Sequence, residues 1–90
     1  MSRETAEEMA QGALAQSDAH LAVSITGIAG PGGATPGKPV GLVHFAAAVR
    51  GGRLIHRAKR YGDVGRRKVR QKSVEEALAM LERLARRAKP

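Results

Sequence analysis

Ninety residues form one domain at most, and a chain of this length buries about two thirds of the surface that it exposes when unfolded. The chain has no cysteine, which excludes disulfides, thiolate metal sites and a cysteine nucleophile. No stretch reaches the roughly 18 apolar residues of a membrane span, and residues 1–11 carry acids where a signal peptide needs an apolar run. We therefore expect a cytoplasmic protein without a membrane partner.

The net charge of +8 is unevenly distributed. Residues 1–37 hold one basic and four acidic side chains, whereas 10 of the 16 basic residues lie between Arg50 and Lys72. Such a basic half keeps a nucleic-acid-binding or non-catalytic interaction module open as an alternative. Tyr61 is the one aromatic residue in this region, and no zinc-finger or RNP motif is present, so nucleic acid is not the partner that we expect.

The first predicted element is a helix from a Ser2 cap to about Ser17. Residues 21–25 read as a strand, and because both of its faces are apolar apart from Ser24, we expect an interior strand. The predicted apolar face of the helix consists of Ala6, Met9, Ala10, Ala13 and Leu14.

A loop rich in glycine and proline follows, then a buried strand over residues 40–49. Gly51 and Gly52 suit a two-residue hairpin turn into an edge strand over 54–61. Asp63 is the predicted cap of a final helix. The predicted core stripe of that helix consists of Val74, Ala77, Leu78, Leu81, Leu84 and Ala85.

These elements predict an α/β fold with the order α-β-β-β-α. The partial sheet has about three strands, a central strand plus a β-hairpin, and two flanking helices. We expect the helices to form one layer over the sheet.

The loop that leaves the first strand is the first candidate site. Thr26 offers a hydroxyl, and Gly27 and Gly30, on either side of Ile28 and Ala29, let backbone amides approach an anion. A flexible connector is the alternative. Further along the loop, residues 32–38 follow most of a P-loop pattern, but Pro39 replaces the magnesium-binding Ser or Thr, and a strand follows instead of a helix.

The second candidate site lies at the start of the final helix. Arg66 and Arg70 are one turn apart and in line with the predicted core stripe, whereas Arg67 turns away. Guanidinium groups at a core edge need an anionic partner such as a phosphate or carboxylate. The alternatives are a buried salt bridge and side chains that reach out to water.

Catalytic groups are not visible. The three histidines, His20, His44 and His56, have no metal-ligand spacing, and we expect His44 to be a packed strand residue. Ser24 lacks the flanking glycines of a nucleophile elbow. We therefore assign no catalytic residue and no metal ligand.

Three motifs in order, VSITGIAGPGG, KPVGLVHFA and YGDVGRRKVRQKSVEEALAML, resemble the CinA carboxy-terminal domain family, the nicotinamide-nucleotide amidases. The helix SRETAEEMAQGAL is similar to the segment that precedes the TGIAGP loop in that family. The resemblance implies hydrolysis of the carboxamide of nicotinamide mononucleotide, in pyridine-nucleotide salvage, without a metal or organic cofactor. It also matches Thr26, Gly27, Arg66 and Arg70 to the family's active-site loop and arginine segment. With the loop residues Ala29 and Gly30, these are the expected substrate- or phosphate-binding residues.

The family's nucleophile belongs to an ESCTGG motif in the front half of its domain, and this motif is absent from residues 1–90. We therefore expect residues 1–90 to form a single partial domain that is catalytically incomplete alone. A homo-oligomer, or a partner chain that completes the domain, is the expected assembly.

Overall fold

The computed structural model describes residues 2–27 and 40–88. It contains helix α1 (Arg3–Ala15), strands β1 (Leu21–Gly27), β2 (Leu42–Val49) and β3 (Leu54–Arg60), and helix α2 (Arg66–Ala88). The strands form an antiparallel sheet in the order β1-β2-β3. The α/β class and the order α-β-β-β-α are therefore confirmed. No helix in the described ranges is both long and apolar enough to cross a bilayer.

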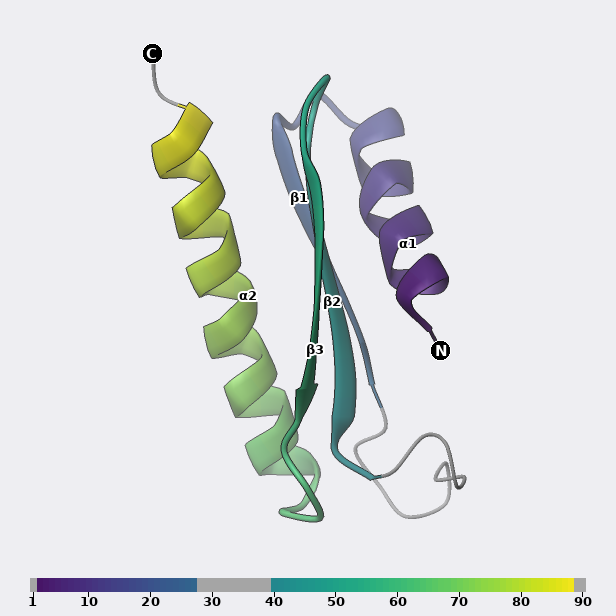
Figure 1. Ribbon diagram of the computed structural model, residues 1–90, viewed down its shortest axis with the longest axis vertical. Helices are drawn as coiled ribbons and strands as arrows, with labels where there is room; N and C mark the ends of the chain where they lie inside the picture. The colour runs from purple at the N-terminus through teal and green to yellow at the C-terminus, as the bar shows by residue number, and fades with distance from the viewer. Residues whose placement is uncertain (1, 28–39, 89–90) are drawn as a thin grey trace.

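The two helices cover opposite faces of the sheet, with α1 on one side and α2 on the other (Figure 1). The prediction of a single helical layer is therefore wrong. Strand β2 explains the arrangement, because both of its faces are apolar: Val43, Phe45 and Ala47 face α2, while Ala46 and Ala48 face α1. A strand with two apolar faces needs a cover on each.

The prediction of a central strand at residues 21–25 is also wrong in part. The strand exists and extends to Gly27, but it lies at an edge of the sheet among the described residues, and β2 is the central strand. Strand β3 forms the other edge, as predicted.

Helix α1 is capped at its start and bound to the β2–β3 hairpin at its end. Its N-cap is Ser2, as predicted, because the Ser2 side chain accepts a hydrogen bond from the Thr5 amide. At its other end the Arg50 guanidinium donates to the carbonyls of Leu14 and Ser17. Three residues of α1 are buried, namely Ala6, Ala10 and Leu14, whereas the predicted core positions Met9 and Ala13 are exposed.

The hairpin between β2 and β3 is wider than predicted. The Val49 amide donates to the Arg53 carbonyl and the Gly52 amide to the Val49 carbonyl, so Arg50, Gly51 and Gly52 form the loop. Only Gly51 of the two glycines has positive φ, at 69°. The extra residue places Arg50 where it reaches α1.

The segment between β3 and α2 fixes the start of α2. The Tyr61 amide donates to the Gly41 carbonyl at 2.9 Å. Gly41 has φ of 86°, and a Cβ there would lie 2.2 Å from the Gly62 carbonyl oxygen, so no other residue fits. Helix α2 then begins at Arg66, after Gly65, and the predicted cap Asp63 lies outside it.

The buried stripe of α2 consists of Val69, Ser73, Ala77, Met80 and Leu84. It is rotated from the predicted stripe, which shares only Ala77 and Leu84 with it. Val74 and Leu78, predicted as core residues, are exposed by 48% and 60%, respectively. Leu81 is half-buried, and Ala85 is exposed.

Candidate functional site

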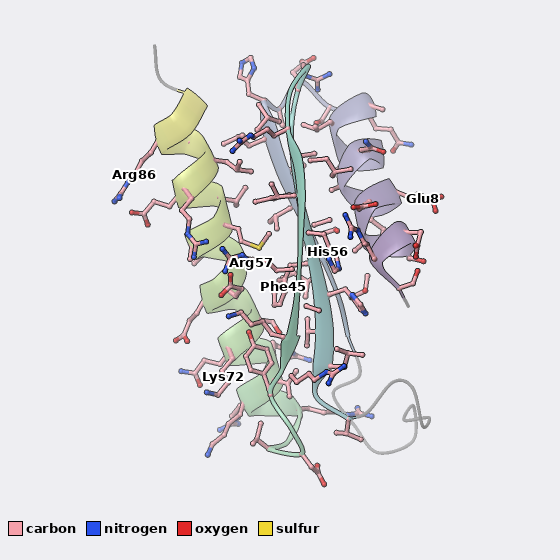
Figure 2. The ribbon with its side chains drawn as sticks, in the orientation of Figure 1. Glu8, Phe45, His56, Arg57, Lys72 and Arg86 are labelled. Carbon is pink, nitrogen blue, oxygen red and sulfur yellow. The ribbon has the colours of Figure 1, made fainter. Side chains whose placement is uncertain are left out.

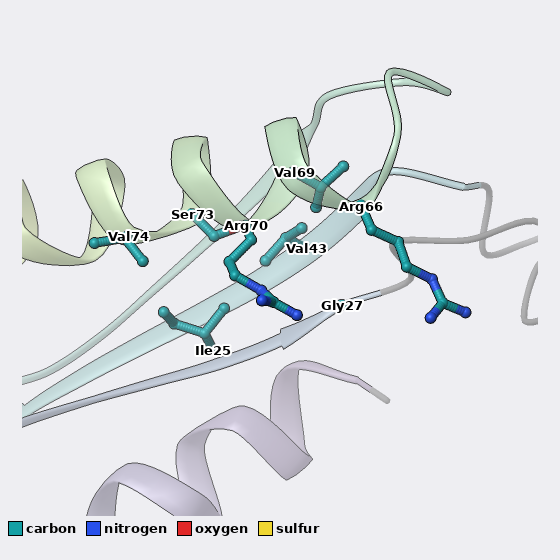
Figure 3. Close-up of a pocket in the computed structure, with 8 residues that line it drawn as sticks. All are labelled: Ile25, Gly27, Val43, Arg66, Val69, Arg70, Ser73 and Val74. Atoms are coloured by element: carbon teal, nitrogen blue, oxygen red, sulfur yellow. The ribbon is translucent and has the colours of Figure 1, made fainter.

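A pocket of about 360 Å³ lies where the start of α2 crosses the end of β1. Arg66, Arg70 and Gly27 line this pocket; Arg70 extends from α2 toward the end of β1, and Arg66 extends past Gly27, beyond the end of the strand (Figure 3). The remaining lining residues are Ile25, Val43, Val69, Ser73 and Val74. The structure therefore brings together three of the residues that the sequence predicts as a site.

Helical geometry aligns the polar groups of this pocket. Arg66, Arg70 and Ser73 lie at i, i+4 and i+7 in α2, so they share one side of the helix. Ser73 is buried in the apolar stripe, and sequence reasoning did not single it out. A serine between valine and alanine in a core stripe is the signal that could have identified it.

Arg66 and Arg70 are exposed and form no ion pair with the acidic side chains of the described residues. The predicted alternative of a buried salt bridge is therefore wrong for this part of the chain. Their positive charge adds to the partial positive charge at the amino terminus of α2. The pocket therefore combines positive charge with apolar walls, and the exposure of both arginines also fits the predicted alternative of side chains that reach out to water.

Gly27 allows the pocket to form close to the sheet. A Cβ on Gly27 would lie 2.8 Å from a methyl carbon of Val43, which is itself buried. A side chain there would displace Val43 or fill the space in front of it. Gly27 is therefore required for close approach to the backbone of β1.

The side chain of Thr26 lies on the other face of the sheet. Ser24, two residues before it, donates to the Ala6 carbonyl of α1, and strand alternation gives Thr26 the same direction. Its hydroxyl oxygen is buried and has no hydrogen-bond partner among the described residues. The structure thus separates the Thr26 side chain from Arg66 and Arg70. Ala29, Gly30 and the P-loop-like residues 32–38 lie outside the described residues.

Two histidines pack beneath α1. His44 Nδ1 and His56 Nε2 are 2.9 Å apart, so one ring donates a hydrogen bond to the other. Burial, followed by the neighbouring His44 and Arg3, lowers the pKa of His56, which favours its neutral form. His44 is half-buried in β2, which confirms its prediction as a packed strand residue.

Residues 1–85 match the CinA C-terminal domain. The chain is 48% identical over 83 residues to a CinA-like protein of Mycolicibacterium vanbaalenii, covering 92% of this chain and 19% of that protein. Among solved structures, a competence/damage-inducible protein from Agrobacterium tumefaciens is 53% identical, with a TM-score of 0.91, covering 94% of this chain and 52% of that one.

A CinA superfamily protein from Escherichia coli is similar at 35% identity, with a TM-score of 0.82, covering 92% of this chain and 47% of the other. The chain therefore spans about half the length of these solved relatives and about a fifth of the curated relative. Sequence and fold agree over nearly all of residues 1–90. The chain belongs to the CinA C-terminal domain family.

Proposed function

We propose that this chain supplies the phosphate-binding part of a nicotinamide-nucleotide amidase domain. Arg66 and Arg70 bind the phosphate of nicotinamide mononucleotide, while the apolar wall of the pocket, with Ile25 and Val74, contacts less polar parts of the ligand. The observation that carries the proposal is that Arg66 and Arg70, which have no ion-pair partner among the described residues, line one pocket with Gly27 at the amino terminus of a long helix.

The loop after β1 has a second role in this proposal. Gly27, Ala29 and Gly30 offer backbone amides, whereas the Thr26 hydroxyl lies on the α1 face of the sheet and takes no part in this role. These groups stabilise negative charge on the substrate during amide hydrolysis. The attacking group comes from the remainder of the domain, because Ser73 has the one hydroxyl among the described residues that line the pocket, and no histidine or acidic side chain is among them to activate it.

A basic surface for nucleic acid is less well supported, because several basic side chains have partners within the fold. Arg50 binds α1 carbonyls, Arg57 and Lys59 lie within 4 Å of Glu76, and Lys72 lies over the Tyr61 ring. The basic residues are therefore divided among separate structural roles and one pocket. A continuous stripe along one face would favour nucleic acid.

Titration of the ¹⁵N-labelled chain with nicotinamide mononucleotide tests the proposal. We expect shifts of the Gly27 amide and of the Arg66 and Arg70 side-chain signals. Arg70→Ala weakens binding by about 1.5–3 kcal/mol, the range for hydrogen bonds to charged groups, which is roughly 10- to 150-fold. Arg67→Ala is the matched control, because Arg67 is a neighbouring exposed arginine that does not line the pocket.

Nicotinamide riboside, which lacks the phosphate, separates phosphate binding from ring binding. The proposal predicts that the riboside binds wild type and Arg70→Ala equally weakly. If Arg70→Ala lowers the melting temperature by several degrees and leaves nucleotide binding intact, Arg70 is a structural residue and the assignment is wrong.

A further inference from the structure

The open edge of β1 carries a strip of exposed apolar side chains. Ile25 is 37% exposed, and Val74 and Leu78 follow it on the side of α2 that faces this edge. Val74 and Leu78 are four residues apart, so they lie one above the other along the helix. Ile25, Val74 and Leu78 are called the β1 strip below.

The β1 strip continues the core beyond the sheet. Ile25 and Val74 line the pocket beside the buried residues Val43 and Val69 (Figure 3). Leu81, one turn beyond Leu78, is half-buried. The apolar face of α2 is therefore wider than the three described strands can cover, which is why the sequence pattern predicts Val74 and Leu78 as core residues.

The backbone at this edge is also unprotected. Strand β1 pairs with β2 along one side, and no described strand pairs with its other side. It has no charged residue, proline or described bulge, which are the usual means by which a protein blocks pairing at a sheet edge. An edge strand with these properties is suited to accept a further strand.

The length of the relatives indicates the occupant. The match covers 94% of this chain but only 52% of the Agrobacterium tumefaciens protein. The solved fold therefore contains, besides the matched part, a further segment of comparable length. A second copy of this chain is disfavoured as the occupant, because each copy carries a charge of +8 and Arg66 and Arg70 flank the β1 strip.

We propose that the β1 strip and the open edge of β1 bind a polypeptide equivalent to the remaining half of the relatives' fold. This polypeptide contributes an apolar face against Val74 and Leu78 and a strand beside β1. Because Ile25 and Val74 also line the pocket, the docked polypeptide forms a wall of the pocket that holds Arg66 and Arg70. The inference rests on the fold and the exposed strip, and it holds whichever ligand the pocket binds.

Co-expression tests the proposal. This chain is produced with the half of the Agrobacterium tumefaciens relative that it does not match, called the complementary half below. Size-exclusion chromatography with light scattering is expected to show a 1:1 complex. Leu78→Glu and Val74→Glu are each expected to weaken the complex at least tenfold.

Met9→Glu is the matched control, because Met9 has the same 48% exposure as Val74 but lies on α1, across the sheet. It is expected to leave the complex intact. Melting curves of the isolated variants show whether each still folds, and Val74→Glu provides a second test if Leu78→Glu does not. The proposal is wrong if no complex forms, if both strip variants still form it, or if this chain alone is a dimer that Leu78→Glu dissociates.

Discussion

The two edges of the sheet differ in charge and in how they are held. Strand β3 carries Arg57, Lys59 and Arg60, and two of these side chains pair with Glu76 of α2. Strand β1 carries no charged residue, and its exposed Ile25 belongs to the β1 strip. Figure 2 shows Arg57 directed toward α2 and His56 toward α1, so β3 contacts both helices. The comparison shows that β3 has the charged composition of an edge strand, whereas β1 has the uncharged composition of an interior strand, which agrees with the proposal that a further strand binds beside it.

The largest expected effect is at the connection that fixes β3. Gly41→Ala forces a left-handed residue against the Gly62 backbone, and we expect it to destabilise the fold by about 2 kcal/mol or more. Gly51→Ala is the control, because Gly51 also has positive φ but has no atom within 4 Å of the added Cβ, and about 1 kcal/mol is expected. Urea denaturation measures both. Equal losses of unfolding free energy in the two variants would show that the close contact between Gly41 and Gly62 does not add to the cost of the substitution.

The ion pairs of β3 should make a smaller contribution. Glu76 lies 3.9 Å from the Arg57 guanidinium and 3.8 Å from the Lys59 ammonium. We expect Glu76→Gln to destabilise by about 1 kcal/mol at low salt, and by less at high salt because ions screen the attraction. Glu75→Gln, at an exposed neighbouring position, is the control. A loss that does not depend on salt would indicate a packing effect instead of an electrostatic one.

The histidine pair gives β3 a pH dependence. The pKa of His56 is lower in the folded state than its ordinary value, so the unfolded chain binds protons more readily. Its contribution to stability is complete above the unfolded pKa of about 6.5 and is lost as the pH falls below it. Arg3 of α1 and His44 oppose the protonated form, whereas Glu4 and Glu7 favour it.

We therefore expect thermal stability to fall as the pH falls below about 6.5, and to fall less in His56→Gln. His20→Gln is the control, because His20 is exposed. If the melting temperature depends on pH identically in wild type and His56→Gln, the histidine pair does not cause the loss of stability at low pH.

The smallest expected effect is at β1. Ile25→Lys changes an exposed side chain that completes no core in the isolated chain, so a change within about 0.5 kcal/mol is expected. The same substitution should disrupt binding of the complementary half. A large loss of stability in the isolated chain would mean that Ile25 already packs in its core, and that β1 needs no further strand beside it.

Much of this asymmetry could be read from the sequence. The uncharged run at residues 21–25 predicts an interior strand, and the charged run at 54–61 predicts an edge. The strand at 21–25 has an edge position here because the described strands supply no neighbour for it. Helical periodicity likewise predicted that Val74 and Leu78 lie in a core. Periodicity shows that a helix face is apolar enough to be buried, but it does not show which part of the structure covers that face.

The candidate site could be predicted only in part. Helical spacing correctly aligned Arg66 with Arg70, and the motif placed Gly27 near them. Treating Thr26 and Gly27 as one binding unit overlooked the alternation of a strand, which sends consecutive side chains to opposite faces. Ser73 was missed because the predicted stripe was rotated by part of a turn.

Hydrogen exchange of the backbone amides, with and without the complementary half, shows directly whether β1 accepts a further strand. In the isolated chain, we expect the amides of β1 that face away from β2 to exchange rapidly. Binding should slow them at least tenfold and leave the outward amides of β3 unchanged. Unchanged exchange in β1, or equal protection of both edges, would contradict the claim that β1 is the open side of this fold.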